Sequence, residues 1–219
     1  MKKIMFKEKF SLESAVFDRS KTMTRRRAKY RGNKEIGFYR WPTGKVVGDG
    51  QYLFIEVLDP DNFSYEPEQY IRSQYHVGEI VAIAQSYREI MDDRKNWDFL
   101  VSKGVMRETD HWVDCWMCES AGFSNKLFVK PELMPHHIRI TGIKAEFLQD
   151  ISDEDCLREG IYEHLKGVQY GFRSNMGYCG QYPFSTPRDA FAALIDKVSG
   201  KGTWQNNQLQ FAYDFEWID

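Results

Sequence analysis

Apolar and polar residues alternate in several parts of the chain, and this period-two pattern predicts β-strands. The alternation is cleanest over residues 208–218 ("QLQFAYDFEWI") and 136–149 ("HHIRITGIKAEFLQ"). A strongly apolar run at 80–84 follows Gly78 and predicts a buried strand after a turn. Residues 4–11 ("IMFKEKFS") and 51–59 ("QYLFIEVLD") predict two further strands. Strands therefore occur at both ends of the chain and in its middle.

Helical periodicity appears in three shorter segments, and each has a recognisable start or end signal. Residues 12–20 place apolar side chains on one face. Residues 153–159 carry acidic side chains in the first turn, where the helix dipole favours them. Residues 187–199 begin with a proline, which suits the first helical turn. The expected capping and terminating residues are Ser11, Ser152, Gly160, Thr186 and Gly200.

The remaining segments predict irregular structure. Residues 28–50 contain glycines, a proline and scattered charges, which is typical of a loop. Residues 91–130 show no clear period, and we interpret about 88–130 as an insertion, with a second at about 162–185. Separate groups of strands and helices predict an α+β fold. We expect a single domain over 1–219, with a small closed or nearly closed sheet.

Composition excludes several classes of protein. Hydrophobic residues make up 42% of the 219 residues and aromatic residues 15%, which is enough apolar surface to fold. No apolar run approaches the roughly 20 residues that a membrane-spanning helix needs. The amino terminus lacks the apolar stretch of a signal peptide, so we expect a cytoplasmic protein without a membrane partner. Four cysteines are too few for a disulfide scaffold and are expected to be free thiols.

The charge is distributed unevenly. The formal net charge is −2, so contact with nucleic acid requires a local patch rather than the whole surface. Residues 18–34 supply such a patch, since their eight Lys and Arg side chains follow Asp18 without another acid. Phosphates would bind the cations, and RNA bases would stack on nearby aromatic rings. The predicted binding residues are Arg25, Arg26, Arg27, Lys29, Arg31, Tyr30, Tyr39 and Trp41.

Three segments together resemble a known family. "KTMTRR" (21–26), "YHVGEIVAIAQ" (75–85) and "RITGIKAEFLQDISDEDCLREGI" (139–161) resemble the ASCH domain of the PUA-like superfamily. The later helix and strand at 190–218 are similar to the closing elements of longer bacterial and phage-associated members. The resemblance implies a PUA-like small β-barrel with flanking helices. It leaves the two predicted insertions unexplained.

The resemblance also implies a candidate site. The family signature is a Gly, Lys, Glu and Arg pattern at the mouth of the barrel, and here Arg19, Lys21, Thr24 and Arg26 occupy those positions. Thr24 departs from the usual glutamate. A branch that removes the acetyl group from N-acetylcytidine also has lysine and threonine there, and its glutamate would fall on Glu159. Lys21, Thr24 and Glu159 are therefore candidate catalytic residues.

Amide hydrolysis by these residues needs a nucleophile and a base. Thr24 could attack if a partly neutral Lys21 took its proton, and Glu159 could orient that lysine or protonate the leaving nitrogen. Residues three apart on a regular strand point to opposite faces. The joint role of Lys21 and Thr24 therefore requires a turn, bulge or helical end between them.

Other readings of the chain stay open. The basic patch could bind RNA or a modified nucleoside without catalysis, or the pocket could be vestigial in a phage-associated or host interaction protein. Cys115 and Cys118 form a Cys-x-x-Cys near His111, but zinc sites usually need a second pair, and Cys156 and Cys179 do not form one. We therefore expect no metal and no cofactor. The oligomeric state is left open.

Overall fold

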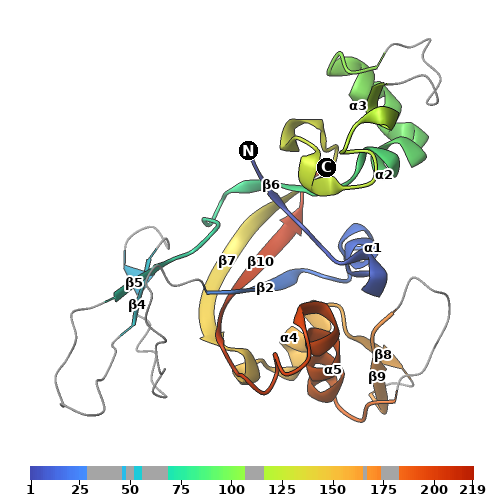
Figure 1. The fold of residues 1–219 in the computed structure, drawn as a ribbon. Coiled ribbons are helices and arrows are strands. Elements are labelled where there is room, and N and C mark those ends of the chain that lie inside the picture. Colours follow the sequence, from blue (N-terminus) through green and yellow to red (C-terminus); the bar gives the residue numbers. More distant parts are fainter. Residues whose placement is uncertain (29–45, 48–51, 56–68, 107–115, 165–166, 174–182) are drawn as a thin grey trace. The chain divides into compact units, whose positions relative to one another are not determined.

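The protein has a mixed α+β fold built on a five-stranded sheet (Figure 1). The computed structural model describes residues 1–28, 46–47, 52–55, 69–106, 116–164, 167–173 and 183–219. The strand order is β1-β6-β7-β10-β2. The strands are β1 (Lys2–Ile4), β6 (Ile80–Ile83), β7 (His137–Phe147), β10 (Leu209–Trp217) and β2 (Met23–Arg27). No helix in these described ranges has both the length and the apolar character needed to cross a membrane.

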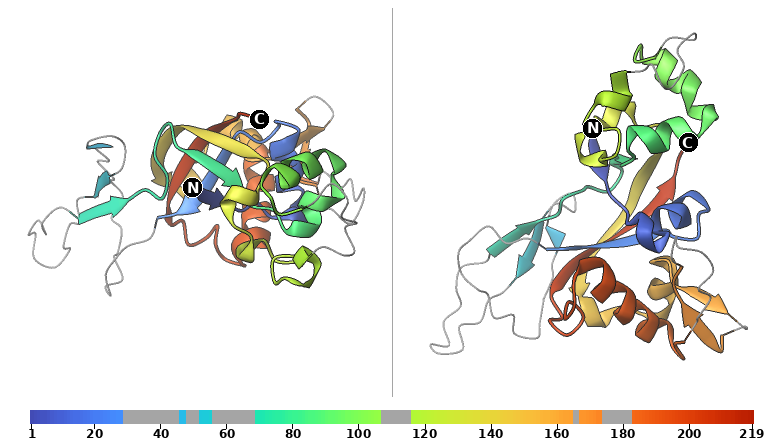
Figure 2. Two further views of the ribbon diagram at one scale, coloured as in Figure 1. Left: turned by 90° about the horizontal axis from the view of Figure 1, so that it is seen from above. Right: turned by 45° about the vertical axis from the view of Figure 1, so that its right-hand side comes forward.

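The sheet is open among the described strands. A barrel closes when the two edge strands pair with one another. Here β1 pairs in parallel with β6 at one edge, and β2 pairs antiparallel with β10 at the other. The expected closed sheet is thus not formed by these five strands. The two long strands β7 and β10 run side by side in all the views (Figure 2).

The chain divides into two compact units, which are described separately. The first comprises residues 1–6, 80–139 and 217–219, and it contains the predicted insertion at 88–130. Its helices pack around a core of apolar side chains that includes Ile90, Leu100, Met117 and Met134. The helical elements are α2 (Tyr87–Asp92), η2 (Arg94–Asn96), α3 (Trp97–Ser102), η4 (Trp116–Glu119), η5 (Lys126–Phe128) and η6 (Pro131–Leu133).

One lysine links the amino-terminal strand to the rest of this unit. The Lys3 ammonium donates hydrogen bonds to the main-chain carbonyls of Lys126, Leu127 and Val129, at 2.9, 2.8 and 2.7 Å. Three carbonyls satisfy the three donors of an ammonium group. Burial lowers the pKa of Lys3. The lysine therefore has a structural role at the start of the chain.

The second unit comprises residues 7–79 and 140–216, and it contains β2 and most of β7 and β10. A three-stranded antiparallel sheet and a two-stranded hairpin accompany them. The short strands are β3 (Val46–Val47), β4 (Tyr52–Ile55), β5 (Gln69–Arg72), β8 (Tyr162–His164) and β9 (Gln169–Gly171). The helices are η1 (Glu8–Phe10), α1 (Leu12–Phe17), η7 (Leu148–Asp150), α4 (Asp153–Arg158) and α5 (Pro187–Ser199).

The clearest sequence patterns are confirmed, and the strand predicted at 51–59 contains β4, whereas another weak pattern is not confirmed. β6, β7, β10 and the three helices α1, α4 and α5 lie where they are predicted. Ser152 and Thr186 cap α4 and α5 through side chains that accept hydrogen bonds three residues later. The predicted strand at 4–11 is wrong, because the chain leaves β1 after Ile4 and turns into η1. The hairpin β8–β9 and the helices α2 and α3 were not predicted.

Candidate functional site

Lys21 and Glu159 meet inside the second unit, although 138 residues separate them in sequence. The Lys21 ammonium donates to Glu159 Oε2 at 2.6 Å and to the Glu159 main-chain carbonyl at 2.6 Å. Their side chains are only 2% and 7% exposed. The two residues that the resemblance places in one site therefore form a buried ion pair.

The main chain around Lys21 and Glu159 holds both members of the pair in position. Glu159 is the residue at which α4 ends, and the left-handed Gly160 (φ +103°) turns the chain immediately after it. A Cβ on Gly160 would lie 3.7 Å from Lys21 Cδ, so the lysine stem packs against this turn. Thr22 donates its amide to the Arg158 carbonyl at 3.0 Å and so joins the two segments. The pair is consequently fixed by main chain on both sides.

Within the pair, the Lys21 ammonium loses its proton more readily than that of an ordinary lysine, because its pKa is lowered. Burial lowers the pKa of Lys21, because a charged ammonium loses its hydration there. Glu159 opposes this change through its charge and hydrogen bond, while the charges of Arg26 and Arg25 add to it. The direction is the one that general-base chemistry by a lysine requires.

Arg25 lies in the interior and shares Glu159 with Lys21. Its Nη1 donates to Glu159 Oε1 at 3.0 Å, and its Nη2 contacts Glu146 and Asp155. The guanidinium also lies 5.9 Å from the centre of the Phe191 ring. The Arg25 side chain is 1% exposed, so it cannot belong to the solvent-exposed phosphate patch predicted for residues 18–34. Its partners are three carboxylates far away in the sequence.

The ion pairs extend beyond these residues. Lys144 contacts Asp155 and lies 3.1 Å from Glu146 Oε2. Arg158 contacts Asp155 at 3.3 Å and pairs with Asp214. Among the described residues the resulting charge network joins four cations to four carboxylates. Its members are Lys21, Arg25, Lys144, Arg158, Glu146, Asp155, Glu159 and Asp214.

Thr24 is buried on β2, opposite Tyr213 of β10. Because side chains alternate along a strand, Thr24 and Arg26 share one face of β2, and Arg25 lies on the other. β2 begins at Met23, so Lys21 precedes the regular strand. The strand rule that would keep Lys21 and Thr24 on opposite faces therefore does not govern this pair. The structure brings Lys21 to Glu159, and it buries Thr24 on the face of β2 opposite to that of Arg25, which also contacts Glu159.

The other predicted binding residues have different surroundings. Arg26 is half-buried, and burial lowers its pKa against the opposing effect of Tyr75, Glu159 and Tyr213. Its Nη1 donates to the Arg25 carbonyl at 3.2 Å. Arg27 is exposed at the end of β2. Lys29, Arg31, Tyr30, Tyr39 and Trp41 lie outside the described residues.

Three carboxylates of the network, Glu146, Asp155 and Asp214, were missed by sequence reasoning. A signal for Asp155 was present, since it precedes Glu159 by four residues and so shares its side of the helical turn. Glu146 and Lys144 are two apart on β7 and share a face of that strand. No comparable sequence signal connects either of them to β2.

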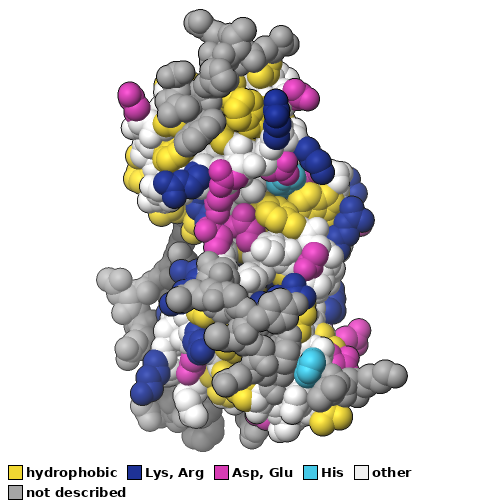
Figure 3. All heavy atoms as spheres, turned by 90° about the vertical axis from the view of Figure 1, so that its right-hand side faces the viewer, with side chains coloured by type: hydrophobic (Ala, Val, Ile, Leu, Met, Phe, Trp, Pro, Cys, Tyr) yellow, Lys and Arg dark blue, Asp and Glu magenta, His cyan; other side chains and the backbone are white. Residues whose placement is uncertain are grey.

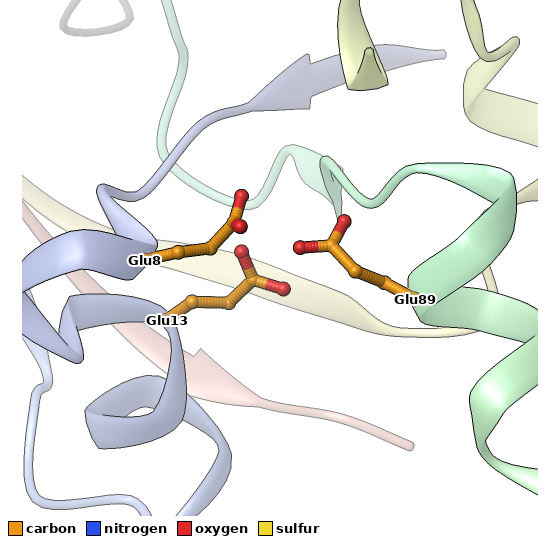
Figure 4. A group of neighbouring side chains, drawn as sticks. All are labelled: Glu8, Glu13 and Glu89. Atoms are coloured by element: carbon orange, nitrogen blue, oxygen red, sulfur yellow. The ribbon is translucent and has the colours of Figure 1, made fainter. Parts of the chain in front are cut away.

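We assign no metal site to the acidic and cysteine side chains that could act as ligands. Glu8, Glu13 and Glu89 are acidic side chains from η1, α1 and α2 (Figure 4). They belong to different units, and Glu89 accepts the Ser86 amide hydrogen bond in the capping box of α2. Cys118 is half-buried, while Cys115 and His111 lie outside the described residues. The predicted absence of zinc at the Cys-x-x-Cys therefore stays a prediction.

Comparisons with known proteins identify neither a family for the chain nor a counterpart of this site. No protein-family model matches the chain. Searches of curated proteins and of solved structures likewise return no significant match. The protein is thus defined as an α+β protein with a buried Lys–Glu–Arg cluster between β2 and the end of α4.

Proposed function

We propose that the protein is a PUA-like, ASCH-related protein that binds a modified nucleoside and hydrolyses the acetyl amide of N-acetylcytidine. The observation that carries the proposal is the 2.6 Å contact between Lys21 Nζ and Glu159 Oε2. The resemblance to the ASCH domain implies the same two residues on sequence alone. A buried lysine with a lowered pKa, set against a carboxylate, is a common arrangement at catalytic sites.

A second observation supports the family part of the proposal. The signature has glycine where this chain has Arg19, and Arg19 adopts a left-handed conformation with φ +64°. Glycine adopts that conformation without steric penalty, whereas other residues do so uncommonly. The backbone at residue 19 therefore has the shape that a glycine signature would specify, immediately before Ser20 and Lys21.

The proposed reaction proceeds through an acyl-enzyme. The neutral Lys21 amine takes the proton of the Thr24 hydroxyl as its oxygen attacks the acetyl carbon. The C–N bond then breaks, and the cytosine amino nitrogen receives a proton from the Lys21 ammonium, leaving cytidine and an acetyl ester on Thr24. Water, deprotonated by Lys21, attacks that ester; the Lys21 ammonium then returns its proton to the leaving Thr24 oxygen, which releases acetate and restores the neutral lysine. Glu159 holds the lysine in place throughout and stabilises its ammonium form.

The experiment is incubation of the purified protein with N-acetylcytidine and chromatographic measurement of cytidine and acetate. Thr24→Ala and Lys21→Ala should each remove most of the rate, and the double variant should lose little more, because the residues act as a unit. Glu159→Gln should retain part of it. The rate should rise with pH and then level off, as Lys21 loses its proton.

Matched controls separate chemistry from folding. Thr22→Ala changes a neighbouring threonine whose hydroxyl accepts from Arg158 outside β2, and it should keep the rate within about twofold. A wild-type protein that leaves the nucleoside intact refutes the hydrolase. A Thr24→Ala protein as active as wild type refutes the assigned nucleophile. Binding of N-acetylcytidine without turnover would favour the non-catalytic reading of the site.

A further inference from the structure

An exposed cation–aromatic stack stands beside the buried pair, at the surface of the second unit. The Arg173 guanidinium carbon lies 4.0 Å from the centre of the Tyr162 ring. Tyr162 opens β8, and Arg173 follows β9 by two residues. A separation of 4.0 Å is the contact distance of stacked groups, so this is a close stack rather than a distant charge above a ring.

Short polar contacts connect this stack to the catalytic candidates. Ser20 Oγ lies 3.2 Å from the Tyr162 hydroxyl, and Ser20 also bonds to Asp18. Arg173 Nη1 lies 3.6 Å from Asp18 Oδ2. Ser20 immediately precedes Lys21, and Tyr162 follows Glu159 by three residues. The stack is therefore tied to the same two chain segments that hold the buried pair.

The stack is open to solvent in a way that the buried pair is not. The Arg173 side chain is 52% exposed and Asp18 is 43% exposed. α1, β8 and β9 lie on the side of the protein that Figure 3 faces, where Lys and Arg side chains reach the surface. An exposed ion pair such as Arg173–Asp18 contributes little to stability in water. The guanidinium is therefore held by two weak contacts, one with the tyrosine ring and one with Asp18.

We propose that Arg173 and Tyr162 form a stacking platform for the base of a pyrimidine nucleoside. The identity of that base rests on the proposed function. Guanidinium planes and tyrosine rings are the surfaces on which proteins stack unpaired bases. The contact between Ser20 and the Tyr162 hydroxyl fixes the ring orientation. The platform supplies affinity beside Lys21, while the buried pair supplies the chemistry.

Binding of N-acetylcytidine to Thr24→Ala protein tests the platform, because that protein does not consume the ligand. Equilibrium dialysis gives the dissociation constant in this background. Arg173→Lys keeps the charge but removes the planar group, and Tyr162→Leu removes the ring. Each should raise the dissociation constant about tenfold, which is the usual worth of stacking one base. Tyr162→Phe keeps the ring and should stay within about twofold.

A matched control lies in the other unit, where Arg88 stacks on Phe123 at 4.9 Å. Arg88→Lys makes the same chemical change away from the platform and should leave the dissociation constant unchanged. Circular dichroism of each variant checks that it is folded. The platform is overturned if Arg173→Lys and Tyr162→Leu bind like the parent, if Arg88→Lys weakens binding equally, or if the parent binds no ligand.

Kinetics on the chain with Thr24 intact separate the two proposals. Arg173→Lys should raise KM about tenfold and leave kcat within about twofold, because stacking supplies binding rather than bond breaking. Hydrolysis with an unchanged KM overturns the platform and leaves the hydrolase standing. If the wild-type chain binds the nucleoside through the platform but does not hydrolyse it, the hydrolase is overturned and the platform stands.

Discussion

Replacing Glu159 by glutamine removes a carboxylate that lies between two buried cations, Lys21 and Arg25. Glu159 contacts Lys21 Nζ at 2.6 Å and Arg25 Nη1 at 3.0 Å, and its side chain is 7% exposed. After the change Arg25 keeps Glu146 and Asp155, so the main loss falls on Lys21. Breaking a buried pair by removing one partner typically costs about 3–5 kcal/mol. We expect a loss of this size in the free energy of unfolding.

The converse change should cost much less. Lys21→Met fills the same space with an apolar side chain and leaves Glu159 paired with Arg25. Replacing a buried cation in this way should change stability by no more than about 2 kcal/mol. The double variant should be more stable than the sum of the two single losses predicts, because the second change removes the cation that the first leaves without its carboxylate.

Urea unfolding at pH 7, followed by circular dichroism, measures these differences, provided that the slope of free energy against urea is unchanged. The matched control is Glu154→Gln, the same substitution at an exposed position of α4, which should stay within about 0.5 kcal/mol of wild type. A Glu159→Gln protein as stable as the Glu154→Gln protein would show that no buried charge depends on Glu159. The structural basis of the proposed function would then be lost.

Three further outcomes follow from the geometry. Gly160→Ala should destabilise the protein more than Gly200→Ala in thermal unfolding. Both glycines have positive φ, which costs about 1 kcal/mol or more for alanine. Of the two, only Gly160 has a neighbour that an added Cβ would contact, Leu12 Cδ2 at 3.2 Å. Equal losses would contradict that close contact. Thr186→Ala should lower stability by about 1 kcal/mol, because the hydroxyl accepts the Asp189 amide at the start of α5, whereas Thr203→Ala, which removes a hydroxyl that donates to a loop carbonyl, should cost less. Burial raises the pKa of Cys156 from 9.0 to about 12, so its thiol should resist iodoacetamide at pH 8 until the protein is unfolded, as mass spectrometry would show. Because its native pKa is raised, the stabilisation from Cys156 is complete below about pH 9 and is lost as the pH rises toward about 12; a Cys156→Ala protein that retains the same alkaline loss would refute this assignment.

Strong periodic patterns were enough to locate the elements that carry the candidate site. The alternation at 208–218 and 136–149 predicted β10 and β7, and the capping residue Ser152 with Gly160 bounded α4. These signals are local, because each depends on residues a few positions apart. Short elements without a sustained period, such as α2 and β8, gave no comparable signal.

Arg25 shows why the surroundings of a site are harder to predict than its elements. In the sequence it stands between basic neighbours, and such a run usually faces solvent. In the structure its three carboxylate partners come from 121 to 134 residues further along the chain. Their proximity depends on β2 pairing with β10 and on where α4 ends. Neither relation is visible in local sequence.

The charge network also restricts how this chain can change over generations. Four cations and four carboxylates share contacts, so altering the sign at one position unbalances several others at once. A lone substitution at Arg25 removes a cation that three carboxylates share, whereas paired replacement of a cation and its anion keeps the sum of the charges at zero. Descendants should therefore alter these positions together or keep them all, and a homologue that had lost Arg25 should also lack at least one of its acidic partners.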